Sequence, residues 1–283
     1  MITSISNSKL TAQIKHLGAE LCSLKNNTNT EFIWKGNPDF WGKHSPVLFP
    51  IVGTLKNNSY LLENEAYQLS RHGFARDLEF ELLESEYNSL LFSLKANDVT
   101  LTNFPFEFEL KIKYTLLDKK LIVQYEVINN SNKKMPFSIG AHPAFSLPSG
   151  FENYSLEFSD IENPEYYLLK NGLISDQTET LNINDQILSL TFKTFDNDAL
   201  VFKTLKSKTI TILENSKPYI KVDFKNFPNL GIWTVQNANF ICIEPWFGYS
   251  DTINSNGEIL EKEGIIILEK NESFKTEFSI EIM

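Results

Sequence analysis

The chain has 283 residues, of which 42% are apolar and 22% are charged, a composition typical of a globular protein that folds around an apolar core. It excludes a disordered chain, a collagen-like repeat and a coiled coil. With 36 acidic against 26 basic residues the net charge is −10, which disfavours binding to a phosphate backbone, so nucleic acid is not an expected partner.

The sequence also indicates the cellular compartment. The longest apolar stretch, residues 47–52, contains a proline and is far shorter than the roughly 20 residues of a membrane-spanning helix. The N-terminus lacks the basic and then apolar segments of a secretory signal, and the only cysteines are Cys22 and Cys242. We therefore expect a cytoplasmic protein with two reduced thiols and no membrane partner.

The segment Asn37 to Trp41 allows a short helical turn. Pro38 lies near a first helical position and Asn37 can act as its cap. The residues fit an irregular loop equally well.

Alternation of apolar and polar residues then dominates the chain. It runs from Phe106 to Leu116 and resumes from Leu121 to Val127 after a polar break at 118–120, which predicts an antiparallel hairpin. The same rhythm recurs at residues 220–225 and 274–282. We expect four half-buried strands in these segments.

The fold class follows from these strands and from composition. Aromatics make up 13% of the chain, with 22 Phe against 12 Gly, and large flat side chains favour strands. No window of about a dozen residues has helical apolar spacing with a cap, and no Gly/Ser-rich or Pro-rich linker divides the chain. The sequence predicts an all-β protein, a large antiparallel β-sandwich with few short helices, in a single domain covering residues 1–283.

Three segments break the alternation and carry side chains that can move a proton or hold a polar ligand. They are RHGFAR at 71–76, IGAHPAF at 139–145 and CIEPWFGYSD at 242–251. Two of the four histidines, His72 and His142, fall in these segments. His16 and His44 are interpreted as ordinary surface or hydrogen-bonded residues.

Glu244 is a candidate general base. It follows an apolar strand, Phe240–Ile243, and precedes Trp246. A carboxylate there is partly desolvated, which raises its pKa and suits it to accept a proton near neutral pH. From this segment alone, a strand-end glutamate paired with Arg71 or Arg76 is an equal alternative, and the aromatic residues that follow fit either a platform for a sugar ring or core packing.

Together these segments resemble the aldose 1-epimerase or galactose mutarotase-like family, in particular its LacX-like branch. The resemblance covers nearly the whole chain and rests on the order and spacing of HGFAR, HPAF and EPW, supported by GAEL, FIWKG, SPVLFPIVG and NDALVF. It implies a large antiparallel β-sandwich whose concave face holds a pyranose, with no metal and no organic cofactor.

The resemblance also implies a role for each polar residue. In that family the histidine of the HP segment is the general acid and the glutamate of the EP segment is the general base that interconvert α and β anomers, which assigns these roles to His142 and Glu244. His72 resembles the family's substrate-binding histidine, and Asp198 falls, by a looser alignment, where an aspartate binds sugar hydroxyls. The implied protein is an isomerase that acts on a small-molecule sugar or sugar phosphate, as a monomer or homodimer.

One departure from the family bears on the substrate. Relatives are expected to have an arginine soon after LFPIVG, where this chain has Thr54 and then Lys56. Either Arg71, Arg76 or Lys56 supplies the cation, or the sugar preference differs. Arg76 with Arg71 offers the paired donors that phosphate favours, which slightly favours a hexose 6-phosphate over a free hexose. Alternatively, Arg76 only pairs with a nearby carboxylate such as Asp77 or Glu244 and orients the site.

Three other functions are weighed against this one. A metal hydrolase could use His72, His142 and Glu244 as a zinc set, but these residues are far apart in sequence and no H-E-x-x-H motif is present. A glycosidase would use two carboxylates, whereas one partner here is an imidazole. A non-catalytic carbohydrate-binding protein would keep the fold without turnover, and a measurement of anomer exchange separates it from an enzyme.

Overall fold

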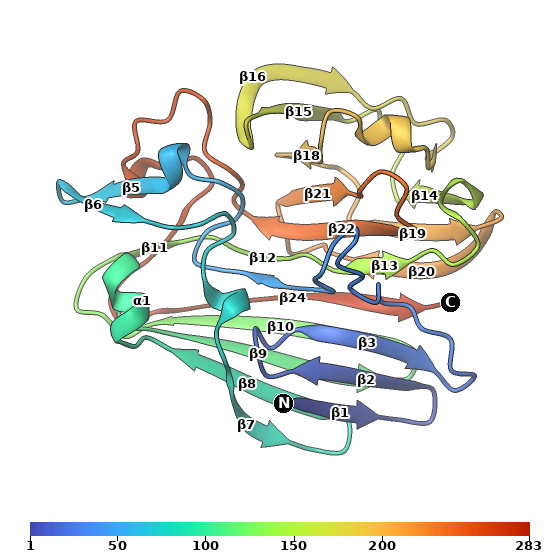
Figure 1. Cartoon of the computed structure of the whole chain (residues 1–283), viewed down its shortest axis with the longest axis horizontal. Coiled ribbons are helices and arrows are strands. Elements are labelled where there is room, and N and C mark those ends of the chain that lie inside the picture. The colour runs from blue at the N-terminus through green and yellow to red at the C-terminus, as the bar shows by residue number, and fades with distance from the viewer.

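The computed structural model describes all 283 residues and contains two large antiparallel sheets (Figure 1). The first has nine strands, in spatial order β17 (Ile187–Ser189), β14 (Tyr154–Phe158), β19 (Thr209–Glu214), β20 (Lys217–Asp223), β24 (Ser273–Ile282), β10 (Lys120–Asn129), β9 (Phe108–Leu117), β8 (Ser89–Lys95) and β7 (Glu81–Ser85).

The second sheet has eight strands and occupies the upper half of Figure 1. Its order is β16 (Leu173–Thr180), β15 (Glu165–Lys170), β18 (Leu200–Phe202), β21 (Asn229–Trp233), β22 (Phe240–Phe247), β12 (Ile139–Ala141) and β4 (Val47–Leu48), and β13 (Ala144–Ser146) also pairs with β22.

Three small sheets complete the fold. They are formed by β1 (Ile2–Ser6), β2 (Leu10–Lys15) and β3 (Leu21–Asn26), by β5 (Ser59–Leu62) and β6 (Glu65–Gln68), and by β11 (Met135–Phe137) and β23 (Ile266–Leu268). The sheet β1–β3 packs on the nine-stranded sheet, where the Tyr114 hydroxyl of β9 donates to the Ala19 carbonyl at 2.7 Å. Ile14 of β2 belongs to the same apolar cluster as Phe92 of β8.

The alternating segments form strands as predicted. β9 and β10 make a hairpin in which Tyr114 faces Val123, and buried side chains alternate with partly exposed ones along both strands. Residues 217–223 and 273–282 form β20 and β24. The alternation of apolar and polar residues therefore identified strands with one solvent-exposed face, because successive side chains of a strand point to opposite faces.

The two large sheets pack face to face around one apolar cluster. It combines residues of the nine-stranded sheet, such as Leu110 and Val123, with Ile241 and Ile243 of β22. Full burial of each such side chain stabilises the fold by about 1.5–3 kcal/mol. The predicted all-β sandwich is confirmed.

Helical structure is short throughout. α1 (Asp98–Asn103) is capped by Asn97, whose side chain accepts from the backbone N–H of Val99 and Thr100. Five 3₁₀ turns cover Lys56–Asn58, Ala75–Asp77, Phe151–Asn153, Phe192–Phe195 and Ile259–Glu261. None of these helices is long and apolar enough to cross a membrane.

The segment Asn37 to Trp41 forms one hydrogen-bonded turn instead of a helix. The backbone N–H groups of Phe40 and Trp41 both donate to the Asn37 carbonyl, at 3.1 and 2.9 Å. The turn does not propagate because the Trp41 carbonyl accepts from the Trp34 indole N–H. Farther along the chain, the N–H groups of His44 and Ser45 donate to the Glu20 carboxylate.

Candidate active site

The candidate site is built on β22, the strand that carries the CIEPW segment. Ile241 and Ile243 point into the core between the sheets, so the alternate residues Cys242, Glu244 and Trp246 point to the opposite face. Glu244 is 1% exposed and lies inside the strand, which continues through Phe247. Its predicted position at a strand end was therefore wrong, and it is more deeply buried than that position implied.

His142 reaches Glu244 through strand pairing. β12 and β13 pair with β22 in one continuous register, with Gly140 opposite Trp246 and Ala144 opposite Cys242. His142 lies between these two pairs and therefore opposite Glu244. The His142 Nε2 and Glu244 Oε2 atoms are 3.2 Å apart.

Two glycines let Trp246 lie flat across the sheet as the floor of the site. A Cβ on Gly231 of β21 would come within 2.4 Å of the Trp246 ring, and a Cβ on Gly140 of β12 within 2.5 Å. Neither glycine has a positive φ. Close approach of the indole, and not backbone conformation, therefore requires glycine at both positions.

His72 approaches from the HGFAR segment. Its φ is +69°, and its ring centroid lies 5.7 Å from that of His142. The Gly53 N–H donates to His72 Nδ1 at 3.0 Å, while Arg71 Nε lies 3.2 Å from His72 Nε2. A neutral imidazole carries one ring proton, so only one of these two donors is hydrogen-bonded to the ring at a time.

The electrostatics of the site follow from desolvation. Burial raises the pKa of Glu244 well above its usual value and lowers the pKa of His142 to about 3, with Arg71 acting in the same direction. Burial, with His142 and the two arginines nearby, also holds the pKa of His72 well below its usual value. Each shift favours the uncharged form of the free protein's side chain.

Four polar atoms in the site have no hydrogen-bond partner although they are buried: Arg76 Nε, His142 Nδ1, Glu244 Oε2 and Trp246 Nε1. The 3.2 Å contact between His142 and Glu244 is thus close without being aligned as a hydrogen bond. Native proteins leave few such atoms unpaired. Their concentration at one place indicates a site that a polar ligand completes.

These residues enclose a cavity of about 390 Å³, within the size range of small-molecule sites. All six site residues predicted from the sequence line it, and they span more than 170 positions of the chain. The lining consists of Trp41, Arg71, His72, Arg76, His142, Asp198, Ala199, Trp233, Glu244 and Trp246. Asp198 has a φ of +79° and is half-buried.

The two arginines, and not Lys56, supply the cations of the cavity. The Lys56 ammonium donates to the Ser255 carbonyl at 3.0 Å, and Thr54 contributes its backbone N–H to the Ser250 hydroxyl. Arg76 donates to the Arg71 carbonyl at 2.7 Å and its Nε lies 3.5 Å from Asp77. Arg76 is therefore paired with Asp77, whereas the Glu244 carboxyl lies against the His142 imidazole.

Sequence reasoning missed two aromatic residues of the cavity. The Trp41 ring stacks on His142 with centroids 4.8 Å apart, and Trp233 contacts the same imidazole edge-on at 5.7 Å. Trp233 lies opposite Cys242 in the β21–β22 pairing. The alternation in residues 229–233 was the available signal, but it does not reveal which strand is the neighbour.

The remaining candidates lie outside the cavity. Phe247 packs on Phe274 at 4.9 Å between ring centroids. His16 contacts the Thr3 hydroxyl at 2.9 Å, and His44 lies beside Glu20. Of the aromatics after Glu244, only Trp246 is part of the cavity.

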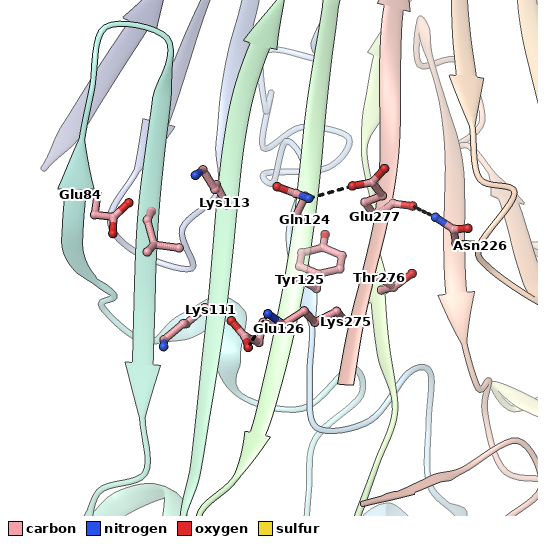
Figure 2. Close-up of a pocket in the computed structure, with 11 residues that line it drawn as sticks. Glu84, Lys111, Lys113, Gln124, Tyr125, Glu126, Asn226, Lys275, Thr276 and Glu277 are labelled. Atoms are coloured by element: carbon pink, nitrogen blue, oxygen red, sulfur yellow. Dashed lines mark hydrogen bonds and ion pairs between the residues drawn. The ribbon is translucent and has the colours of Figure 1, made fainter. Parts of the chain in front are cut away.

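A second hollow lies on the nine-stranded sheet, with lysine, glutamate and glutamine side chains on neighbouring strands (Figure 2). These side chains bind one another. Gln124 donates to Glu277 at 2.8 Å, and Lys275 pairs with Glu126 at 3.1 Å. The hollow contains none of the predicted site residues, and its charges compensate each other.

The side chains that the fold gathers as potential metal ligands differ from those of the metal-hydrolase alternative. Ligand atoms of His142, Cys242 and Glu244 lie within 4.8 Å of one another. This group contains Cys242 in place of His72.

Fold and cavity together define a β-sandwich protein with a tryptophan-lined polar site, the kind of surface that binds the apolar face and the hydroxyls of a small polar ring. Comparison with known proteins gives the class. The sequence profile of the family described as aldose 1-epimerase matches residues 1–280, and the chain belongs to this family.

Individual relatives agree with this assignment. Two LacX proteins of Lactococcus lactis subsp. lactis, one chromosomal and one plasmid-borne, are each 38% identical over 280 residues, covering 92% of this chain and 92% of the relative. A galactose mutarotase related enzyme from Lactobacillus acidophilus has a TM-score of 0.95 at 32% identity, covering 100% of this chain and 97% of that one. A galactose mutarotase-like protein from Lactobacillus casei has a TM-score of 0.92 at 31% identity, covering 100% of both chains.

Proposed function

We propose that this protein is an aldose 1-epimerase that interconverts the α and β anomers of a hexose or hexose 6-phosphate, with Glu244 as general base and His142 as general acid. The observation that carries the proposal is the buried pair itself, with His142 Nε2 and Glu244 Oε2 3.2 Å apart in the wall of a polar cavity. Family membership makes a sugar the expected substrate.

The reaction needs two coupled proton transfers. Glu244 accepts the proton of the C1 hydroxyl while His142 donates a proton to the ring oxygen, the C1–O5 bond breaks, and an open aldehyde forms. Rotation about C1–C2 and the reverse transfers close the ring on the other face. Each positioned transfer contributes about 10² to 10⁴ in rate.

The free pair already holds the proton that this reaction requires. A neutral imidazole with a protonated carboxyl contains as many protons as an imidazolium with a carboxylate, and the two forms differ by one transfer across the 3.2 Å contact. Burial favours the neutral form in the empty cavity. Sugar hydroxyls that hydrogen-bond to the pair stabilise the ionic form that begins the reaction.

The other polar residues of the cavity bind the sugar in this proposal. His72 holds it near the ring oxygen, Asp198 accepts from hydroxyl groups, and the Trp246 and Trp41 rings offer apolar faces.

The arginines favour a phosphorylated substrate. Arg71 and Arg76 both line the cavity, and the Nε of Arg76 is buried without a hydrogen-bond partner. Two guanidinium groups offer the donors that a phosphate ester prefers. Asp77 offsets part of the charge of Arg76, so the preference for a hexose 6-phosphate over a free hexose is expected to be moderate.

The Glu244→Gln variant tests the reaction. The amide keeps the shape of the side chain and cannot accept the proton, so kcat should fall by at least about 10² while sugar binding is largely retained. Anomer exchange of glucose, galactose and their 6-phosphates is followed by NMR. A variant that exchanges its best sugar as fast as the parent would show the assignment of Glu244 to be wrong.

The same assay tests the substrate and the non-catalytic alternative. Arg76→Ala should reduce kcat/KM selectively for the 6-phosphates, with Lys56→Ala as a matched control, because the Lys56 ammonium is held by Ser255 outside the cavity. Equal losses of kcat/KM for the free hexoses and their 6-phosphates would contradict the proposed phosphate preference. Binding of a hexose with no acceleration of anomer exchange by the parent protein would identify a carbohydrate-binding protein instead.

A further inference from the structure

The thiol of Cys242 lies within 4.8 Å of ligand atoms of the proposed acid–base pair, and neither proton transfer uses it. Cys242 is fully buried and packs among Trp34, Ala144 and Phe240. On β22 it is two residues from Glu244 and faces the same side of the sheet, so its position relative to the pair is fixed by the strand.

We propose that His142, Cys242 and Glu244 form a binding site for one thiophilic divalent cation, such as Zn²⁺ or Cd²⁺, and that this ion excludes the sugar. Binding of the ion is independent of the proposed function. Only the consequence that the ion inhibits anomer exchange rests on it.

The geometry is close to that of a bound ion. Bonds of about 2.0–2.3 Å from a tetrahedral ion place neighbouring ligand atoms roughly 3.3–3.8 Å apart. The His142 and Glu244 atoms are 3.2 Å apart, and all three ligand atoms lie within 4.8 Å. A shift of about 1 Å at the sulfur completes the set, and the fourth position opens toward the cavity.

Small residues lie opposite two of the three ligands, although the Trp246 ring covers Gly231 and Trp233 is the second cross-strand neighbour of Cys242. Cys242 lies opposite Ala144, whose small side chain is its neighbour on β13. Glu244 lies opposite Gly231 on the other side. Glu244 Oε2 has no hydrogen-bond partner in the protein, so binding the ion breaks no hydrogen bond at this atom.

The charges balance in the bound state. The cation displaces one proton from the Cys242 thiol and one from the His142–Glu244 pair, leaving a thiolate, a carboxylate and a neutral imidazole around the ion. These two negative charges neutralise the divalent cation in a desolvated site. The ion then occupies the atoms that the proposed mechanism requires for proton transfer.

Cadmium titration of the intact protein tests the site directly. Thiolate-to-cadmium charge transfer absorbs in the ultraviolet, and calorimetry gives the stoichiometry and affinity. The parent and Cys22→Ala should bind one ion with this absorption, because Cys22 lies on β3, in another sheet, and is not one of the three clustered ligands. Cys242→Ala should lose the absorption and bind at least about 100-fold more weakly. Absorption that persists in Cys242→Ala, or that is absent in the parent, overturns the proposal.

A second measurement covers the case in which Cys242→Ala does not fold. In the parent, saturating hexose should weaken cadmium binding, and Glu244→Gln should weaken it as well because an amide oxygen is the poorer ligand. Unchanged affinity in both experiments overturns the site.

The readouts separate this inference from the proposed function. Cadmium binding without any anomer exchange would support the ion site and contradict the proposed enzymatic activity. If saturating cadmium leaves the rate of anomer exchange unchanged, the ion does not exclude the sugar, and the proposed enzymatic activity still holds. If both the ion site and the anomer exchange are confirmed, added EDTA leaves the rate of the purified enzyme unchanged or restores it after metal exposure, and never abolishes it.

Discussion

At the scale of single residues, His72 shows how a functional side chain is held in an unfavourable backbone conformation. Its φ of +69° is uncommon for residues other than glycine, although histidine adopts it more often than most. Two hydrogen bonds with Gly53 hold it there: the His72 N–H donates to the Gly53 carbonyl at 2.8 Å, and the Gly53 N–H donates to the ring at 3.0 Å. The ring is thereby fixed beside His142 as an uncharged group.

His72→Asn should reduce the loss of stability in acid. Asparagine tolerates a positive φ and removes the buried imidazole. In the unfolded parent this imidazole takes up a proton below about pH 6.5, whereas in the folded protein its pKa is held well below that value. The unfolded state therefore binds more protons as pH falls, and stability is lost.

Between pH 7.5 and pH 5 the parent should lose up to about 2 kcal/mol more of its free energy of unfolding than His72→Asn does. Urea titrations at several pH values measure the difference. Parallel pH dependences of the two proteins would contradict a buried neutral His72.

At the scale of elements, the site depends on the pairing of β22 with β12, β13 and β21. The shared register places His142 opposite Glu244, and glycine on β21 and β12 lets the Trp246 ring lie between them. A residue larger than glycine at either position would displace the Trp246 ring, which forms the floor of the cavity.

Gly231→Ala should therefore destabilise the protein by about 1–3 kcal/mol, because the added Cβ would lie 2.4 Å from the Trp246 ring. Gly42→Ala is the matched control, since its Cβ would meet nothing closer than 3.9 Å, and it should change stability by less than about 0.5 kcal/mol. Denaturant unfolding followed by tryptophan fluorescence measures both. Equal effects of the two substitutions would show that Trp246 is not confined by Gly231.

At the scale of the whole molecule, a buried ion pair joins three distant segments next to the site. The Lys262 ammonium lies 3.1 Å from the Asp251 carboxylate, with both side chains 3% exposed. It also donates to the Tyr249 carbonyl at 2.6 Å. Asp251 accepts in turn from the Lys56 backbone N–H at 2.9 Å, so the loop after β22 is held to residues near both 56 and 262.

Lys262→Met should cost about 3–5 kcal/mol, because it leaves the Asp251 charge buried without its partner. Lys134→Met is the control, since Lys134 pairs with Glu269 and these side chains are 63% and 55% exposed, and loss of an exposed pair changes stability little. Thermal and urea unfolding give both values. A cost for Lys262→Met no greater than for the control would mean that Asp251 finds water or another donor.

Local sequence patterns were enough to predict four of the strands and the candidate residues. Period-two alternation in residues 106–127 predicted the β9–β10 hairpin, because a half-buried strand requires that pattern locally. The RHGFAR, HPAF and EPW segments, together with NDALVF, indicated the family and named six residues that all line one cavity. The helical turn at residues 37–41 stayed undecided, because the hydrogen bonds that end it come from Trp34 and Glu20.

Only the tertiary structure decided how these residues meet. Cross-strand register set His142 against Glu244 and brought Trp233 and Cys242 beside them. The partner of Lys56 is a carbonyl nearly 200 residues away, which removed this lysine from the candidate cations. Alternation along a strand shows which side chains share a face, but it does not show which strand lies alongside, because pairing is selected by packing across the whole sheet.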